Sequence, residues 1–316
     1  MRISIVGLGV LGTSLGLALK SATKDIPITG HDPDVALVSR AKHLGAIDHS
    51  HWNLISACCE ADLVVLDLPF QEIAPTLTAL CDDLKEGAVI LDTAPLNMPV
   101  IEMAHRVLRE GTAFVGGHVV APALGLGQPE PSADLLRDAI FHLSIPEQVP
   151  AEAAEVAVNF AMAVGATPHF VDALEHDGLA AVTAQLPLLG ALALANVIER
   201  APGGKGRAEF VGAELTTLGA MLGGERAQPA EALCANGSNL LPWLDGYIEE
   251  LGSVRALLAA GDNEGLAALV AVGRESAGRW SPQAEAETEP RPPSTVSVWR
   301  SLFLGGLGRS RRPPRD

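Results

Sequence analysis

Apolar and polar positions follow two alternating patterns along the first half of the chain. Short, nearly continuous apolar runs, which are typical of buried strands, are followed by longer segments with apolar residues at helical spacing. We predict strands at 2–6, 26–30, 61–68, 87–92, 112–117 and 139–145. We predict helices between them at 13–22, 35–44, 71–84 and 97–110. Strands that alternate with helices of this length indicate a doubly wound parallel sheet, so we assign an α/β domain of the Rossmann type to residues 1–148.

The second half of the chain has a helical pattern almost throughout. We expect helices at 151–165, 172–200, 208–222, 229–235, 238–259 and 263–278, and a short strand at 167–171. The segment 172–200 is interrupted only by Pro187 and is too apolar for a solvent-facing helix, so we expect it to pack on several sides. We therefore predict an all-helical substrate and dimerisation domain at 149–280, through which the protein forms a homodimer. Residues 281–316 begin with a Pro/Glu/Thr-rich stretch, and we predict a disordered tail there.

A glycine-rich turn connects the first predicted strand to the first predicted helix. Its residues are Gly7, Leu8, Gly9, Val10, Leu11 and Gly12, and an acidic residue, Asp32, follows 20 positions after the last glycine. In a turn of this G-x-G-x-x-G type the glycines permit a tight turn, close approach of a pyrophosphate, and close packing of helix and strand. The N–H groups at the start of the helix then face the phosphates. Asp32 can accept hydrogen bonds from the ribose hydroxyls and would repel a 2′-phosphate, so we predict NAD as the cofactor.

The predicted strands of the first domain end in residues that can line one cleft. Ligands of doubly wound sheets bind at the carboxyl ends of the strands. Leu68, Pro69, Thr93 and His118 all lie at such ends. We therefore expect Leu68, Pro69 and Thr93 to contact the cofactor, and His118 to lie near the substrate.

The composition argues against several classes of protein. A net charge of −16 over 316 residues argues against a nucleic-acid partner, and it makes binding of an anionic substrate depend on locally placed cations. The four cysteines have neither zinc-site nor disulfide-framework spacing, so we predict no metal site and free thiols in a reducing cytoplasm. No uninterrupted apolar run reaches the roughly 20 residues of a membrane span. Glycines interrupt the first apolar stretch, which argues against a signal peptide.

Several stretches of the sequence resemble the prephenate dehydrogenase family. They are GLGVLGTSLGLAL, ADLVVLDLP, LDTAP, FVGGH and EHDGLAAVTAQLPLL, and the resemblance covers about residues 1–275. The first motif fits any Rossmann dehydrogenase, whereas FVGGH on a late strand, followed by EHD and LP on a long helix, is more specific. The resemblance implies a Rossmann domain followed by a helical dimerisation domain. It also implies NAD-dependent oxidative decarboxylation of prephenate to 4-hydroxyphenylpyruvate, a step of tyrosine biosynthesis.

The resemblance further implies roles for individual residues. His118 matches the family's catalytic histidine, which takes the proton of the substrate hydroxyl, a task that suits a side chain with a pKa near neutral. Pro69 matches the position that borders the nicotinamide. His176 and Asp177 match a His-Asp pair at the start of a helix, where an acidic residue is also ordinary for structural reasons.

The substrate side departs from the family pattern. Pro95 stands in place of a serine expected to assist the histidine, and Leu218 in place of an arginine expected to bind a carboxylate. Gln185 and Leu188 replace two histidines of the long helix. Because burying a doubly negative substrate without polar or cationic partners is costly, we take Gln185, Lys205 and Arg207 as candidates for binding it.

Three hypotheses about function remain open at this point. The first is a prephenate dehydrogenase that holds its substrate with other groups. The second is an NAD-dependent oxidoreductase of the same fold that acts on another small molecule such as arogenate, and the third is a catalytically silent NAD-binding dimer. The glycine turn and Asp32 are compatible with all three, whereas His118 favours the first two. We adopt the first as the working prediction.

Overall fold

The computed structural model describes residues 1–316 except 24, 122–129, 201–210, 224–229 and 281–316. The chain divides into two compact units, Met1–Gly246 and Tyr247–Asp316. The first unit contains the sheet and all the predicted site residues that the structure describes.

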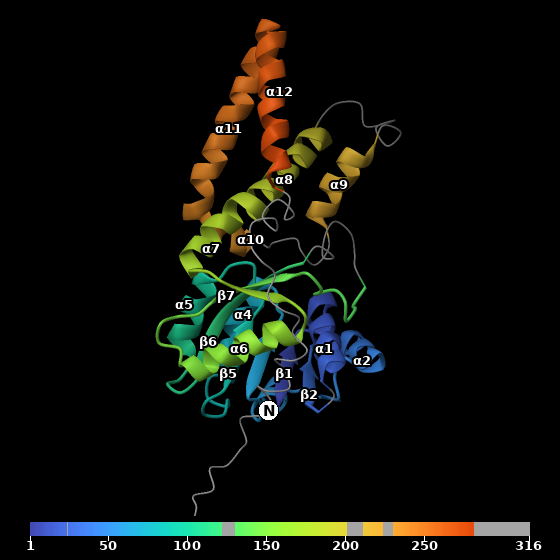
Figure 1. Cartoon of the computed structure of the whole chain (residues 1–316), viewed down its shortest axis with the longest axis vertical. Helices are drawn as coiled ribbons and strands as arrows, with labels where there is room; N and C mark the ends of the chain where they lie inside the picture. The colour runs from blue at the N-terminus through green and yellow to red at the C-terminus, as the bar shows by residue number, and fades with distance from the viewer. Residues whose placement is uncertain (24, 122–129, 201–210, 224–229, 281–316) are drawn as a thin grey trace, which may run out of the picture. The chain divides into compact units, whose positions relative to one another are not determined.

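One eight-stranded sheet forms the centre of the first unit, with strand order β3-β2-β1-β4-β5-β6-β7-β8 (Figure 1). The strands are β1 (Ile3–Val6), β2 (Ile28–His31), β3 (His49–Ser50), β4 (Leu63–Leu66), β5 (Val89–Asp92), β6 (Ala113–Val120), β7 (Ile140–Ser144) and β8 (Thr167–Phe170). The strands from β3 to β6 are parallel to one another. Their order reverses between β1 and β4, which is the point where ligands of doubly wound sheets bind.

The prediction of a parallel sheet is wrong for the last two strands, β7 and β8, which run opposite to the others. Strand β7 runs antiparallel to β6, and β8 runs parallel to β7. An antiparallel neighbour needs no crossover helix, so β7 can pair directly with the strand that precedes it in the chain. The α/β class itself is confirmed.

Helices cover both faces of the sheet. They are α1 (Val10–Ala22), α2 (Val35–Leu44), α3 (Leu54–Cys58), α4 (Phe70–Leu80), α5 (Met98–Val107) and α6 (Ala151–Ala163). Helix α1 packs against α6, while α4 packs against α3 and α5. The central strands β1, β4 and β5 are buried at every position, which explains why their sequences are almost continuously apolar.

The sheet extends past the domain boundary that we drew after residue 148. Strand β8 pairs with β7, and α6 packs against β5, β6, β7 and β8. Residues 151–170 therefore belong structurally to the α/β layer. The helices that follow in this unit are α7 (Ala173–Ala180), α8 (Leu186–Arg200), α9 (Ala213–Leu222) and α10 (Ala230–Ala235).

Helices α7 and α8 are joined by a π-helical segment, Ala181–Gln185, into one continuous helical run. The N–H of Leu186 donates to the carbonyl of Ala181, five residues back, immediately before Pro187. π-Helical turns of this kind occur mostly as short insertions inside α-helices, often near functional sites. The run Ala173–Arg200 is long and apolar enough to cross a membrane by length and composition alone, and only 22% of its most apolar window is buried.

The second unit is described from residue 247 to residue 280. Helix α11 (Gly237–Ala260) enters it from the first unit, and α12 (Asn263–Gly278) follows. Gly261 adopts a positive φ of 66° between the two helices, and the carboxylate of Asp262 caps α12 by accepting from the N–H of Gly265. Large apolar side chains on these helices are exposed, including Leu258 and Val272.

Candidate functional site

The glycine turn between β1 and α1 packs so closely against neighbouring backbone that two of its positions leave no room for a side chain. Gly7 has a φ of 93°, and a Cβ atom at this residue would lie 1.9 Å from the carbonyl oxygen of Asp67. A Cβ atom at Gly12 would lie 2.0 Å from the carbonyl oxygen of Gly7. Both positions therefore require glycine. The N-cap of α1 is Gly9, which has no side chain to accept from the first N–H groups of the helix, so acceptors for these groups come from other parts of the chain or from a bound anion.

Asp32 follows β2 and lies against the glycine turn. Its Oδ2 accepts a hydrogen bond of 2.8 Å from the N–H of Leu8, and its Oδ1 accepts one of 2.8 Å from the N–H of Asp34. The carboxylate is thus fixed beside the turn, at the end of the strand next to β1. An acidic group in this place can accept the hydroxyl hydrogens of an adenosine ribose.

Asp67, which follows β4, directs its carboxylate at the start of α1. Its Oδ2 accepts a hydrogen bond of 2.6 Å from the N–H of Gly12. The hydroxyl of Thr93, at the end of the neighbouring strand β5, lies 2.9 Å from Oδ1 and donates to it. Sequence reasoning named Thr93 but overlooked Asp67, although its place beside Leu68 and Pro69 was a signal that could have found it.

Leu68 and Pro69 lie at the same edge as Asp67. Leu68 is half-buried and packs against the core on the α4 side, and Pro69 is exposed at the N-cap of α4. The structure therefore brings together the glycine turn, Asp32, Asp67 and Thr93 at the carboxyl ends of adjacent strands.

His118, on β6, takes part in a chain of hydrogen bonds that ends at a buried carboxylate. Its Nδ1 lies 3.0 Å from Nε2 of His176, and Nδ1 of His176 lies 2.9 Å from Oδ1 of Asp177. His118 is half-buried, whereas His176 and Asp177 are 5% and 1% exposed. The His-Asp pair at the start of α7 is therefore in direct contact with the predicted catalytic histidine.

Asp177 is fixed by backbone donors as well as by the histidine. Its two carboxylate oxygens accept from the N–H groups of Asn97 and Met98, at 2.8 and 2.9 Å, where α5 begins. The side-chain amide of Asn97 donates to Ser144 on β7. These contacts tie the start of α7 to the sheet, so the position of His176 is set by buried hydrogen bonds.

Two further histidines extend this cluster on β7 and β8. His142 pairs in register with both His118 and His169, and its Nδ1 lies 3.2 Å from Nδ1 of His169. Its ring centroid lies 6.2 Å from that of His118 and 5.7 Å from that of His176. Burial, together with the neighbouring His176 and His169, lowers the pKa of His142 to about 4. At neutral pH this ring is uncharged, so it offers hydrogen bonding without a positive charge.

Asp92 is a buried acid that supports the strand carrying His118. Its side chain is fully buried, with Oδ1 accepting from the N–H of Gly117 at 2.8 Å and Oδ2 accepting from the N–H of Ala94 at 3.2 Å. Burial raises the pKa of Asp92 to about 8, the nearby Asp177 carboxylate adds to this, and the two backbone hydrogen bonds oppose it. The acid is one of the functional-site neighbours that sequence reasoning did not single out.

The predicted substrate-binding residues are only partly described. Gln185 is fully buried in the π-helical segment, and its carbonyl oxygen accepts a hydrogen bond of 2.7 Å from the side chain of Asn236. Lys205 and Arg207 lie outside the described residues. The structure thus brings Gln185 into a buried polar network and leaves the two cations unplaced.

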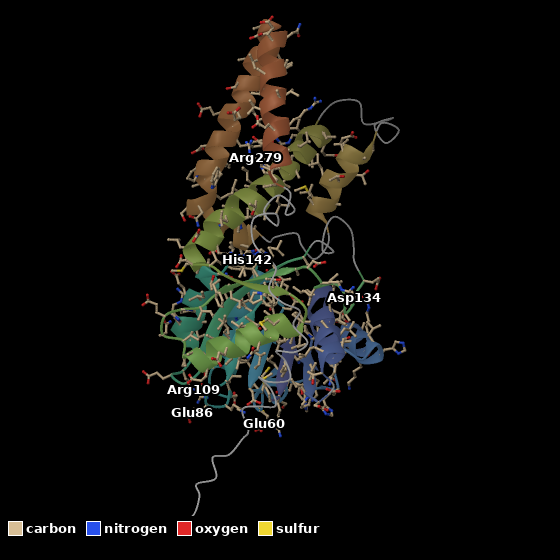
Figure 2. All side chains as sticks on the ribbon, viewed as in Figure 1. Glu60, Glu86, Arg109, Asp134, His142 and Arg279 are labelled. Carbon is tan, nitrogen blue, oxygen red and sulfur yellow. The ribbon has the colours of Figure 1, made fainter. Side chains whose placement is uncertain are left out.

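A cavity of about 710 Å³ lies away from these residues, near the starts of strands β5 and β6. Its lining includes Gly87, Arg109 and Gln148. Figure 2 shows Arg109 and Glu86 at this end of the strands, well away from His142 at the other end. Its walls contain none of the predicted site residues. Across the described ranges there is no group of three or more His, Cys, Asp or Glu side chains able to hold a metal ion.

Comparisons with known proteins match the chain to dehydrogenases. The family model described as prephenate dehydrogenase, nucleotide-binding domain, matches residues 15–169. The chain is 26% identical over 269 residues to a cyclohexadienyl dehydrogenase of Zymomonas mobilis, a match that covers 83% of this chain and 90% of the relative. It is 25% identical over 268 residues to a prephenate dehydrogenase of Bacillus subtilis, covering 84% and 72% of the two chains.

Solved structures of a prephenate dehydrogenase and an arogenate dehydrogenase have the same fold as this chain. The structure of a prephenate dehydrogenase from A. aeolicus in complex with hydroxyphenyl propionate and NAD+ matches with a TM-score of 0.77 at 19% identity, covering 89% of this chain and 98% of that one. The structure of Synechocystis arogenate dehydrogenase matches with a TM-score of 0.70 at 22% identity, covering 89% and 100%. At these identities the two matches bear on the fold alone.

Proposed function

Because this chain belongs to the prephenate dehydrogenase family, we propose that it is an NAD-dependent enzyme that converts prephenate to 4-hydroxyphenylpyruvate. The observation that carries this proposal is the hydrogen-bonded series His118, His176 and Asp177. It lies on strand β6 and helix α7, in the same unit as a glycine turn suited to a dinucleotide.

The glycine turn, the start of α1 and Asp32 fit the pyrophosphate and ribose of NAD. Gly7 and Gly12 permit the close backbone packing that the turn needs, and the positive dipole end of α1 attracts the charge of a pyrophosphate. Asp32 is suited to the ribose hydroxyls and unsuited to a 2′-phosphate, which favours NAD over NADP. When bound, NAD supplies the acceptor for the hydride that leaves the substrate.

The hydrogen bonds also assign a tautomer to His118. The Asp177 carboxylate can only accept, so Nδ1 of His176 carries a hydrogen and its Nε2 is left as an acceptor when the ring is neutral. The Nδ1 of His118 then donates to that atom, and the lone pair of His118 falls on Nε2. This is the protonation state that a general base requires.

In the proposed reaction His118 accepts the proton of the C4 hydroxyl of prephenate on Nε2. Hydride leaves C4 as the C–O bond becomes a double bond, and the ring carboxylate departs as CO₂ while the ring becomes aromatic. His118 then returns its proton to the phenolate oxygen, so prephenate and NAD+ give 4-hydroxyphenylpyruvate, CO₂ and NADH, and the histidine is neutral again. His176 and Asp177 do not touch the substrate in this scheme and act as positioning residues for His118.

We keep Gln185, Lys205 and Arg207 as proposed partners of the substrate carboxylates. Gln185 would use its amide NH₂ group, because its carbonyl oxygen accepts from Asn236. Arogenate is the second candidate substrate. It carries an amino group in place of the keto group of prephenate, and a smaller net negative charge suits a chain with Leu218 at the family's arginine position.

We further propose that the protein is a cytoplasmic homodimer. Leu192, Leu194 and Val197 of α8 are between 40% and 65% exposed in the single chain, an arrangement that suits burial against a second copy. Self-association would cover the apolar surface of the Ala173–Arg200 run, which otherwise meets the length and composition of a membrane span. We propose the helical part of the chain as the dimerisation domain.

The proposal is tested by following the absorbance of NADH with purified protein, NAD and prephenate, with arogenate in a parallel assay. Turnover with prephenate is expected. Turnover with arogenate alone would change the substrate, and absence of turnover with both would overturn the proposed reaction. Size-exclusion chromatography with light scattering tests the homodimer.

A further inference from the structure

Asp67 places a negative charge beside the glycine turn. The carboxylate lies at the start of α1, with Oδ2 2.6 Å from the backbone nitrogen of Gly12, the last glycine of the turn. A Cβ atom at Gly12 would lie 3.1 Å from the same oxygen and 2.0 Å from the carbonyl of Gly7. The acid is therefore packed into the turn itself and is not a side chain at its rim.

Two sets of contacts keep Asp67 in this position. Its backbone N–H donates to the carbonyl of Val6 at 2.8 Å, and its own carbonyl is the group that excludes a side chain at Gly7. The hydroxyl of Thr93 donates to Oδ1. The backbone of Asp67 is thus fixed against β1, and its carboxylate accepts from the N–H of Gly12 in α1 and from the hydroxyl of Thr93 at the end of β5.

This arrangement has a direct electrostatic consequence. The first N–H groups of a helix and its positive dipole end attract one anion, and Asp67 already supplies a carboxylate there. A pyrophosphate that approaches the same turn brings further negative charge within a few ångströms of the carboxylate. Repulsion at this range is substantial because the site is only partly exposed to water.

We infer that Asp67 sets the affinity for the cofactor, because its carboxylate occupies the Gly12 N–H in the free protein and repels the pyrophosphate of a dinucleotide. This inference rests on the proposed function, since it requires that a dinucleotide binds at the glycine turn. It makes the free protein a self-inhibited form in which a side chain stands where the ligand's charge belongs. It also assigns Thr93 a role through Asp67, because the Thr93 hydroxyl holds that carboxylate in place.

The substitution Asp67→Asn isolates the charge. An asparagine has nearly the same shape and its side-chain oxygen can still accept from the Gly12 N–H, so the turn keeps its hydrogen bond. The matched control is Asp83→Asn, which removes one negative charge from an exposed residue after α4, at the opposite end of the strands. Binding of NAD, NADH and ADP-ribose to each purified protein is measured by isothermal titration calorimetry, with no substrate present.

The expected result is that Asp67→Asn lowers the dissociation constant of all three ligands by about tenfold, which corresponds to about 1.4 kcal/mol, while Asp83→Asn leaves it unchanged. The three ligands share the pyrophosphate, so the same factor is expected for each. Loss of affinity for NAD alone would show that the carboxylate attracts the positively charged nicotinamide ring, and would overturn the inference.

Other outcomes separate this inference from the proposed function. Measurable and equal binding by the native protein and Asp67→Asn overturns the inference and leaves the cofactor assignment intact. Absence of binding by every protein overturns both. Thermal unfolding checks that each variant folds, and Asp67→Ser, which removes the charge with a smaller side chain, replaces Asp67→Asn in the same test if the latter does not fold.

Discussion

The Nδ1 atom of His118 on β6 lies 3.0 Å from the Nε2 atom of His176 on α7, and this contact joins the sheet to the helix that follows it. Asp177 fixes the far side of His176 and is itself fixed by the start of α5. The side chain expected to take a proton is therefore oriented by a buried carboxylate through an intervening imidazole. A buried series of this kind favours one tautomer and one ring orientation of the terminal histidine.

Replacement of His118 by asparagine is expected to abolish turnover and leave NAD binding nearly unchanged. Asparagine cannot accept and hold a proton near neutral pH, and loss of a general base typically costs about 10²–10⁴-fold in rate. Turnover is measured from NADH formation and NAD binding by calorimetry. The control is His105→Asn at an exposed position on α5, and native turnover in His118→Asn would remove His118 from the mechanism.

Substitutions of His176 distinguish positioning from simple structural support. His176→Gln retains an acceptor for His118 and a donor for Asp177, whereas His176→Leu retains neither. We expect kcat to fall by about tenfold or more in the leucine variant and clearly less in the glutamine variant, with KM for substrate little changed in both. Equal losses in the two variants, or a loss confined to KM, would contradict the positioning role.

Much of the α/β layer is predictable because its information is local. Central strands such as β4 are buried on both faces, and their continuous apolar runs are visible in the sequence. Strand β3 has two residues and an edge position, so it carries no pattern to detect. The reversed direction of β7 is equally invisible, because a run of apolar residues does not specify which way a strand points.

The candidate site divides in the same way. The glycine turn and Asp32 are defined by spacing within 32 residues, and spacing is what a sequence displays. The contact between His118 and His176 spans 58 residues and depends on how α7 meets the sheet. The contact between Asp67 and Gly12 likewise spans 55 positions, so the place of Asp67 at a strand end is visible in the sequence but the group that its carboxylate meets is not.

Asp32→Ala is expected to weaken NAD binding by about tenfold or more while changing NADP binding much less. The substitution removes the acceptor for the ribose hydroxyls, but it also removes the charge that repels a 2′-phosphate. Dissociation constants for both dinucleotides provide the measurement. Asp34→Ala is the control, because Asp34 caps α2 and its loss is expected to affect stability by about 1 kcal/mol without changing the preference between dinucleotides. Equal weakening of NAD and NADP in Asp32→Ala would contradict the ribose contact.

The lowered pKa of His142 predicts a loss of stability in mild acid. In the unfolded chain this histidine binds a proton near its ordinary pKa of 6.5, whereas in the folded protein it does so only near pH 4. The unfolded state therefore binds more protons than the folded state between pH 6.5 and pH 4, so the free energy of unfolding falls as the pH falls through this window. The ring is only partly buried, so we expect the loss to be about 1–2 kcal/mol rather than the full value of the shift.

Urea unfolding at the two ends of this pH window, in the native protein and in His142→Phe, measures the loss of stability in acid. The phenylalanine variant should lose less stability in acid than the native protein, His105→Phe should behave like the native protein, and identical losses in all three would show that His142 does not contribute.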